Sequence, residues 1–276
     1  MKKRFAAFLA AALMGTMILA GCGNEKEEAK AAETSAETAA ETKVDETKAA
    51  ETTAGEAVDK VILVVSFGTS YNDSREATIG AIETAIADAN PEYEVRRAFT
   101  SQIIIDKLKE RDGLEIDNVE EALDRAVADG VKTLVVQPTH LMDGYEYTDL
   151  ADALKEYEDK FEQVVLAEPL LTSDEDFDAV AKAIAEETAS YDDGQTAICF
   201  MGHGTEADSN GIYAKLQEKM TAGGYENYYI GTVEAEPSLE DLKEALAAKG
   251  TYTKVVLEPL MVVAGDHANN DMAGDD

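Results

Sequence analysis

The sequence predicts an α/β fold in which parallel sheets, flanked by helices on both faces, form two similar lobes that face each other across a cleft. The first observation behind this prediction is that, from Lys60 onward, runs rich in valine, isoleucine and leucine alternate with amphipathic segments. Near-continuous apolar strands that alternate with helices are typical of parallel sheets buried on both faces. The second observation is a weak internal repeat, which predicts the two lobes.

Strand-like and helix-like segments alternate along the chain. The strand-like runs are residues 60–67, 93–99, 132–138, 163–170, 196–201, 228–233 and 252–260. The helix-like stretches are residues 74–89, 101–111, 119–128, 149–160, 174–187, 211–222 and 239–248. Residues that commonly cap helices stand at several of the expected starts, in the segment 72–74 and at Ser173 and Ser238.

The internal repeat involves the ends of strands. Residues 61–70 (VILVVSFGTS) and 196–206 (TAICFMGHGTE) both read as a strand, then an aromatic residue or a histidine, then Gly-Thr. Residues 134–144 and 255–265 both read as an apolar strand, a proline, and a glycine six residues after the proline. A duplicated domain explains this pattern, although glycine-rich strand ends look alike in any α/β protein.

The composition excludes one class of partner. The 276-residue chain has 24 Lys and Arg residues against 57 Asp and Glu residues, a formal charge of -33. This charge argues against nucleic acid, whose binding requires a basic surface. It is compatible with attraction of divalent cations. The two cysteines, Cys22 and Cys199, imply no disulfide framework.

The N-terminal segment is predicted to be a targeting signal rather than part of the fold. Basic residues at positions 2–4 precede an apolar stretch over residues 5–19, and the segment Leu19-Ala20-Gly21-Cys22 follows. This pattern resembles the bacterial lipoprotein signal, with residues 1–21 as signal peptide and Cys22 as the lipidated residue; the alternative is an uncleaved helical anchor. Residues 22–59 are rich in Ala, Glu, Thr and Lys and predict a disordered acidic tether. The protein is therefore expected to be extracytoplasmic and lipid-anchored to the cell membrane.

The chain has three histidines, and each follows an apolar, strand-like run: His140, His203 and His267. Imidazole is a common ligand for transition metals and a common proton carrier near neutral pH. Ligands of open α/β sheets gather at the ends of strands. The placement indicates one site assembled from distant segments, although a single histidine beside a strand is often structural.

Four segments carry a family resemblance: AFTSQIIIDKL (98–108), QPTHLMDGYEY (137–147), FMGHGTE (200–206) and GDHANNDMAGDD (265–276). Together they resemble the anaerobic-type sirohydrochlorin cobaltochelatases, a ferrochelatase-like family, over residues 60–276. The resemblance implies two Rossmann-like lobes, expected at residues 60–190 and 191–276, with a tetrapyrrole in the cleft. It also implies insertion of Co2+, and often of Fe2+, without a nucleotide, in cobalamin biosynthesis; imidazole ligands would suit Ni2+ as well.

The resemblance implies roles for particular residues. His140 and His203 are expected to be metal ligands, and His140 also the proton acceptor. Glu168, near the end of the fourth strand-like run, is the expected third ligand, with Glu234 and Glu236 as competitors. Two imidazoles and a carboxylate suit a borderline divalent metal that must later be surrendered.

Other residues are expected on the substrate side of the site. Gly202 and Gly204 flank His203, and their amide groups could bind a substrate carboxylate, or serve only a turn. Hydroxyls of Ser66 and Thr69 could bind acidic ring substituents, or serve only helix capping. His267 is expected in a loop on the substrate side rather than as a ligand. The chain stops inside this last motif, so the second lobe is expected to be incompletely covered.

Two functions remain open at this stage. One is an extracytoplasmic chelatase, and the other is a non-catalytic lipoprotein that captures metal, haem or a related tetrapyrrole for uptake. Sirohydrochlorin is a polycarboxylate, so an acidic protein needs a locally positive cleft to bind it. Arg96 and Arg97 are the candidates for this positive charge. The alternative is that they are ordinary residues at the edge of a strand. The sequence leaves a homo-oligomer open.

Overall fold

Four parallel strands form the first sheet of the described chain, in the order β2-β1-β3-β4. Their bounds are Lys60–Ser66 for β1, Glu94–Phe99 for β2, Thr133–Pro138 for β3 and Gln163–Leu166 for β4. The structure is a computed structural model that describes residues 58–274. The predicted signal peptide and all but the last two residues of the predicted tether lie outside the described residues.

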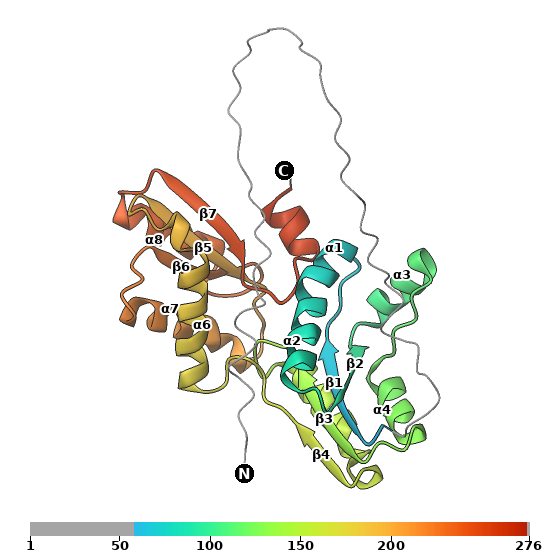
Figure 1. The fold of residues 1–276 in the computed structure, drawn as a ribbon. Helices are drawn as coiled ribbons and strands as arrows, with labels where there is room; N and C mark the ends of the chain where they lie inside the picture. The colour runs from blue at the N-terminus through green and yellow to red at the C-terminus, as the bar shows by residue number, and fades with distance from the viewer. Residues whose placement is uncertain (1–57, 275–276) are drawn as a thin grey trace, which may run out of the picture. The chain divides into compact units, whose positions relative to one another are not determined.

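Helices cover the first sheet (Figure 1). They are α1 (Asn72–Arg75), the π-helical turn η3 (Glu76–Gly80), α2 (Ala81–Ala89), α3 (Gln102–Asp112), α4 (Val119–Ala128), α5 (Tyr145–Lys155) and the short 3-10 turn η4 (Glu158–Lys160). Alternate residues of β1, namely Val61, Leu63 and Val65, pack in one buried cluster with α4 and α5. Because side chains alternate across a strand, these residues share one face of the sheet.

Three parallel strands form the second sheet, in the order β6-β5-β7. Their bounds are Thr196–Gly202 for β5, Tyr228–Thr232 for β6 and Lys254–Pro259 for β7. The helical segments of this part are α6 (Asp174–Glu187), α7 (Ile212–Ala222), α8 (Leu239–Lys249), the 3-10 turns η5 (Ala189–Tyr191) and η6 (Asp208–Gly211), and the π-helix η7 (His267–Met272). The two parallel sheets with flanking helices confirm the predicted α/β class.

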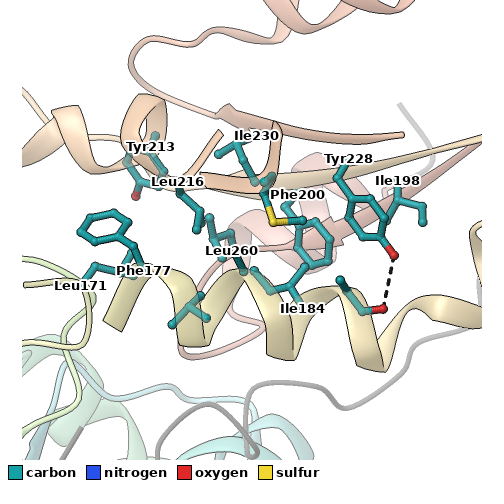
Figure 2. Packing of buried hydrophobic residues seen from close by; sticks show 14 of the residues in the cluster. Leu171, Phe177, Ile184, Ile198, Phe200, Tyr213, Leu216, Tyr228, Ile230 and Leu260 are labelled. Carbon is teal, nitrogen blue, oxygen red and sulfur yellow. Dashed lines mark hydrogen bonds between the residues drawn. The ribbon is translucent and has the colours of Figure 1, made fainter. Parts of the chain in front are cut away.

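The core of the second sheet lies between β5 and the helices α6 and α7. Ile198 and Phe200 of β5 pack with Phe177 and Ile184 of α6 and with Leu216 of α7 (Figure 2). Helix α6 therefore packs on the second sheet, although the predicted lobe boundary at residues 190 and 191 assigned it to the first lobe. Its amphipathic pattern fits either sheet equally well, so the sequence alone did not decide between them.

The opposite face of β5 is also buried. Cys199 and Met201 point to this face and pack with Leu242 of α8. Burial raises the pKa of the Cys199 thiol to about 12. The thiol is therefore protonated at neutral pH.

The two sheets share one hydrogen-bond register, as the internal repeat predicts. In the first sheet Thr100 donates its backbone N–H to Ser66. In the second sheet Val233 donates in the same way to Gly202. Ser66 pairs with Phe99 of β2, and Gly202 pairs with Thr232 of β6. The last residues of β1 and β5 thus accept the same backbone hydrogen bond from the residue that follows the neighbouring strand.

Several expected element bounds were wrong. Helix α5 begins at Tyr145 rather than at residue 149, because its first turn is mostly exposed and carries no apolar periodicity. Strand β4 ends at Leu166 rather than at residue 170. Beyond it Pro169 has no N–H to donate, and Leu170 donates instead to the His140 carbonyl at 3.0 Å.

The expected cap at residues 72–74 was also wrong. Tyr71 precedes the first turn and makes no side-chain cap. The Asn72 side chain instead accepts hydrogen bonds from Arg75 and Arg111. By contrast, Ser173 and Ser238 each form a capping box with the third residue of the helix that follows, as predicted.

Within the part of the chain that the structure describes, no helix combines the length and the apolar character needed to cross a membrane.

Candidate metal-binding site

His203 follows the last residue of strand β5 and lies between Gly202 and Gly204. Close packing at both neighbouring positions leaves no room for a Cβ atom. A Cβ atom on Gly202 would lie 2.1 Å from Cε1 of the buried Tyr213 ring. Gly204 has a φ of +86°, and a Cβ there would lie 2.8 Å from the backbone nitrogen of Ala235. The Gly204 amide donates to the Tyr213 hydroxyl at 3.3 Å. These contacts give both glycines a structural role, and their expected contact with substrate stays a prediction.

One ring nitrogen of His203 makes a hydrogen bond to the backbone, and the other faces a carboxylate. Its Nδ1 lies 2.8 Å from the Gly204 carbonyl oxygen, which only accepts, so Nδ1 carries the proton. The remaining nitrogen, Nε2, lies 3.7 Å from Oε2 of Glu234, and about half of the His203 side chain is exposed. Hydrogen bonds of this kind fix the tautomer of metal-binding histidines.

His267 is arranged in the same way. It is the first residue of η7 rather than a loop residue as expected. Its Nδ1 lies 2.6 Å from Oδ2 of Asp271, one helical turn further along, and its Nε2 lies 3.8 Å from Oε1 of Glu234. The rings of His203 and His267 meet edge to face, with centroids 4.8 Å apart. The two histidines therefore direct Nε2 at the two oxygens of one carboxylate.

Glu234 completes this group from the segment after β6. Its backbone N–H donates to the His203 carbonyl at 2.9 Å, which ties the two segments together. One ligand atom from each of His203, Glu234 and His267 lies within 4.8 Å of the others. Two ligand atoms bound at about 2.1 Å to one ion in tetrahedral geometry are about 3.4 Å apart, so the observed separations are close to those of a metal site.

His140 follows β3 and is buried, with 9% of its side chain exposed. Neither of its ring nitrogens makes a hydrogen bond among the described residues. Its Nε2 lies 3.4 Å from Oε2 of Glu146, a distance without hydrogen-bond geometry. Burial lowers the pKa of His140 to about 4, so the ring is neutral at physiological pH and has a free lone pair.

Glu146 links His140 with the other histidines, and sequence reasoning missed it. It lies in the first turn of α5. Burial raises the pKa of its carboxyl, and the nearby His203 partly offsets this rise. A signal for it exists in the repeat, because Glu146 follows Pro138 at the same spacing at which His267 follows Pro259.

Glu168 lies beyond β4 and is exposed. The next residues run beside the His140 segment, since Leu170 and Leu171 donate backbone hydrogen bonds to His140 and Leu141. Among residues 58–274, however, the three-residue group that could hold a metal contains His203 but neither His140 nor Glu168. The set of His140, Glu168 and His203 therefore stays a prediction.

The remaining expected site residues lie as follows. Ser66 and Thr69 are buried, and the Ser66 hydroxyl accepts a hydrogen bond from Thr139 at 2.9 Å. The Thr69 hydroxyl accepts one from the Tyr71 backbone at 3.3 Å. Glu236 is exposed and does not belong to the group of His203, Glu234 and His267. These positions show internal contacts, and the expected substrate contacts stay predictions.

The two arginines expected to line a positive cleft are paired with acids. Arg96 contacts Glu94 and Asp129, each at 2.7 Å. Arg97 makes two hydrogen bonds to the Glu83 carboxylate. Their charges are offset locally, which favours the interpretation of a strand edge over that of a substrate-binding patch.

Two parallel α/β sheets carry imidazole and carboxylate groups beyond the ends of their strands, which is the arrangement expected of a metal-handling protein of the chelatase type. The chain belongs to the cobalt chelatase (CbiK) family, whose profile matches residues 60–276. A protein from Salmonella typhimurium named sirohydrochlorin cobaltochelatase is 39% identical over 217 residues, which cover 79% of this chain and 81% of that protein. Sirohydrochlorin cobaltochelatase CbiKC from Nitratidesulfovibrio vulgaris is 30% identical over 220 residues, covering 79% and 76% of the two chains.

Proposed function

We propose that this protein is a sirohydrochlorin cobaltochelatase, which inserts Co2+ into the free-base ring and releases two protons, as a step of cobalamin biosynthesis. Membership of the cobalt chelatase family and the names of both relatives support this proposal. The reaction requires a metal with exchangeable ligands and acceptors for the two pyrrole protons. It requires neither a nucleotide nor a redox step, because cobalt enters and remains as a divalent ion.

The observation that carries the proposal is the buried, neutral His140 beside Glu146. The free lone pair of His140 can accept a pyrrole proton, and the Glu146 carboxylate 3.4 Å away can stabilise the imidazolium that results. Glu146 can itself accept the second proton. A protein that only carried metal or tetrapyrrole would need no proton acceptor at this position.

We propose that His140, Glu168 and His203 hold the ion until it passes to the ring, and that the His140 lone pair accepts a pyrrole proton only after the ion has left it. Imidazole nitrogen and carboxylate oxygen suit Co2+, and they also suit Fe2+ and Ni2+. Which of these ions is used in the cell is therefore a matter of supply as well as of ligand type. Substrate contacts from Ser66, Thr69, Gly202 and Gly204 remain part of the proposal at lower priority.

The direct test is to mix the full chain with sirohydrochlorin and Co2+ and to follow the absorbance spectrum of the ring. The expected result is metallation at least tenfold faster than in the blank of metal and ring. His140→Gln should return the rate to near that of the blank. Tight binding of haem or of the ring without any acceleration would instead support a non-catalytic binding protein.

We also propose that the protein acts outside the cytoplasm, anchored to the membrane through lipid on Cys22. The support is the basic, apolar and small-residue pattern of residues 1–22 and the acidic segment that follows it. The same pattern favours the second candidate function, a lipoprotein that captures metal, haem or a tetrapyrrole for uptake. The two candidates differ in turnover, because only a chelatase metallates more than one ring per chain.

A further inference from the structure

We propose that His203, Glu234 and His267 form a loading site, which binds the substrate Co2+ before the ion reaches the ring. This inference rests on the proposed function and adds a second position for the metal. His203 would belong to both positions, so the ion need exchange only its other ligands as it moves toward His140. Glu146 lies 3.4 Å from His140, and His203 is near enough to act on the pKa of the Glu146 carboxyl, so this carboxylate is close to a ligand of each position.

The orientation of both imidazoles supports a site built for a cation. Each ring uses Nδ1 as a donor to an oxygen, His203 to Gly204 and His267 to Asp271. Nε2 of each ring is turned to the Glu234 carboxylate, at 3.7 Å from His203 and 3.8 Å from His267. In the neutral ring this nitrogen carries a lone pair, so the three residues can offer one ligand atom each within 4.8 Å. A divalent cation binds such a group in place of the proton that an imidazolium would share with Glu234.

Comparison of the two lobes shows that the fold alone does not demand these ligands. In the first lobe Ser101 donates its backbone N–H to Phe67, just as Glu234 donates to His203 in the second. At the positions of His203 and Glu234 the first lobe therefore carries Phe67 and Ser101, and the same backbone hydrogen bond forms without either ligand. At the position of His267, eight residues after the proline, the first lobe carries Glu146. Two of the three candidate ligands of the second lobe are thus absent from its structural repeat.

Exposure and ligand number suit temporary binding. About half of the side chain is exposed in both His203 and Glu234, so an ion can arrive from solvent. Three protein ligands leave further coordination positions open, unlike the closed four-ligand cages of structural metal sites. A site of this kind binds an ion and can also surrender it.

The test is a calorimetric titration of the full chain with Co2+ alone, without tetrapyrrole. Wild type is expected to bind one ion at this site. Glu234→Gln and His267→Gln should each weaken binding at least tenfold, and Asp271→Ala, which removes the acceptor that orients the His267 ring, should weaken it roughly tenfold. Glu244→Gln, which removes one exposed carboxylate from α8 of the same lobe, is the matched control and should bind as wild type does.

A kinetic measurement separates this inference from the proposed function. His267→Gln should raise KM for Co2+ at least tenfold and leave kcat unchanged, because saturating metal bypasses loading. Unchanged Co2+ affinity and KM in both Glu234→Gln and His267→Gln would overturn the loading site while leaving the chelatase function in place. If wild type fails to metallate the ring but these variants still lose Co2+, the proposed function fails and the metal site stands.

Discussion

The Nε2 atom of His140 lies 3.4 Å from Oε2 of Glu146, at a place where the ring makes no hydrogen bond. The imidazole is buried and neutral, whereas the carboxylate is half exposed. A proton taken up by the ring would therefore meet a group able to stabilise it and to pass it toward solvent. Two predictions concern this pair.

Glu146→Gln should lower the rate of metal insertion at least tenfold at neutral pH, because the amide neither accepts a proton nor stabilises the imidazolium. Co2+ affinity without the ring should change less than threefold. Initial rates with sirohydrochlorin and a Co2+ titration measure the two effects. Asp152→Asn removes an exposed carboxylate from the same helix and serves as the control. A Glu146→Gln rate equal to that of the control would exclude Glu146 from proton transfer.

The stability of the protein should depend on pH through His140. Its pKa in the folded state, about 4, lies below the ordinary value of 6.5, so the unfolded chain binds the proton more readily. As the pH falls from 6.5 to 4, wild type should therefore lose about 3 kcal/mol of unfolding free energy through this residue. Urea unfolding of wild type and His140→Gln across this range checks the prediction. Parallel pH profiles for the two proteins would contradict it.

Gly202→Ala should destabilise the protein by roughly 1–3 kcal/mol, because the added methyl group would overlap the buried Tyr213 ring. The strand end must shift to accommodate it, so Co2+ affinity at His203 should also fall. Gly211→Ala is the control, since a Cβ atom there has no neighbour within 4 Å. Thermal unfolding of both variants measures the difference. Equal melting temperatures for the two variants would contradict the prediction, because they would show that the end of β5 accommodates the methyl group without a loss of stability.

Glu168→Gln distinguishes the insertion ligands from the loading ligands. If Glu168 binds the ion only during insertion, the rate should fall at least tenfold while Co2+ affinity without the ring stays within twofold of wild type. Glu162→Gln, an exposed change just before β4, is the control. A wild-type insertion rate in Glu168→Gln would remove this residue from the ligand set.

Cys22→Ser should release the protein from the membrane fraction of cells, because the acylated residue would be lost. Immunoblots of membrane and soluble fractions, together with labelling by a fatty-acid analogue, measure this change. Ser35→Ala, in the segment after Cys22, is the control and should remain labelled. Equal labelling of the Cys22→Ser protein would contradict the proposed anchor.

Much of the fold could be predicted because the spacing of apolar residues along the sequence reflects which side chains are buried. Helices α4 and α6 have the predicted bounds, since each combines an amphipathic stripe with a capping box. The start of α5 was missed because its first turn packs nothing apolar, and the π-helical η7 was expected as a loop. Hydrogen bonds of the Asn72 side chain to distant Arg111 also have no local signal.

The site could be predicted only in part, because its distances depend on tertiary structure. The sequence indicated that scarce histidines at strand ends gather, and His203 and His267 do so. It favoured His267 as a substrate-side residue, yet the ring lies against Glu234, one of the competitors weighed for the third ligand. Asp271, which orients His267, carried one local signal, namely its spacing of one helical turn.

The burial of Cys199 has a consequence for metal choice. This thiol lies on β5, the strand that His203 follows, yet it faces α8 and remains protonated, with a pKa of about 12. Soft ions such as Cu(I) prefer thiolate sulfur, and a thiolate so near the entry point would capture them or be oxidised. By keeping its sulfur dry and protonated, the strand offers an arriving ion nitrogen and oxygen alone.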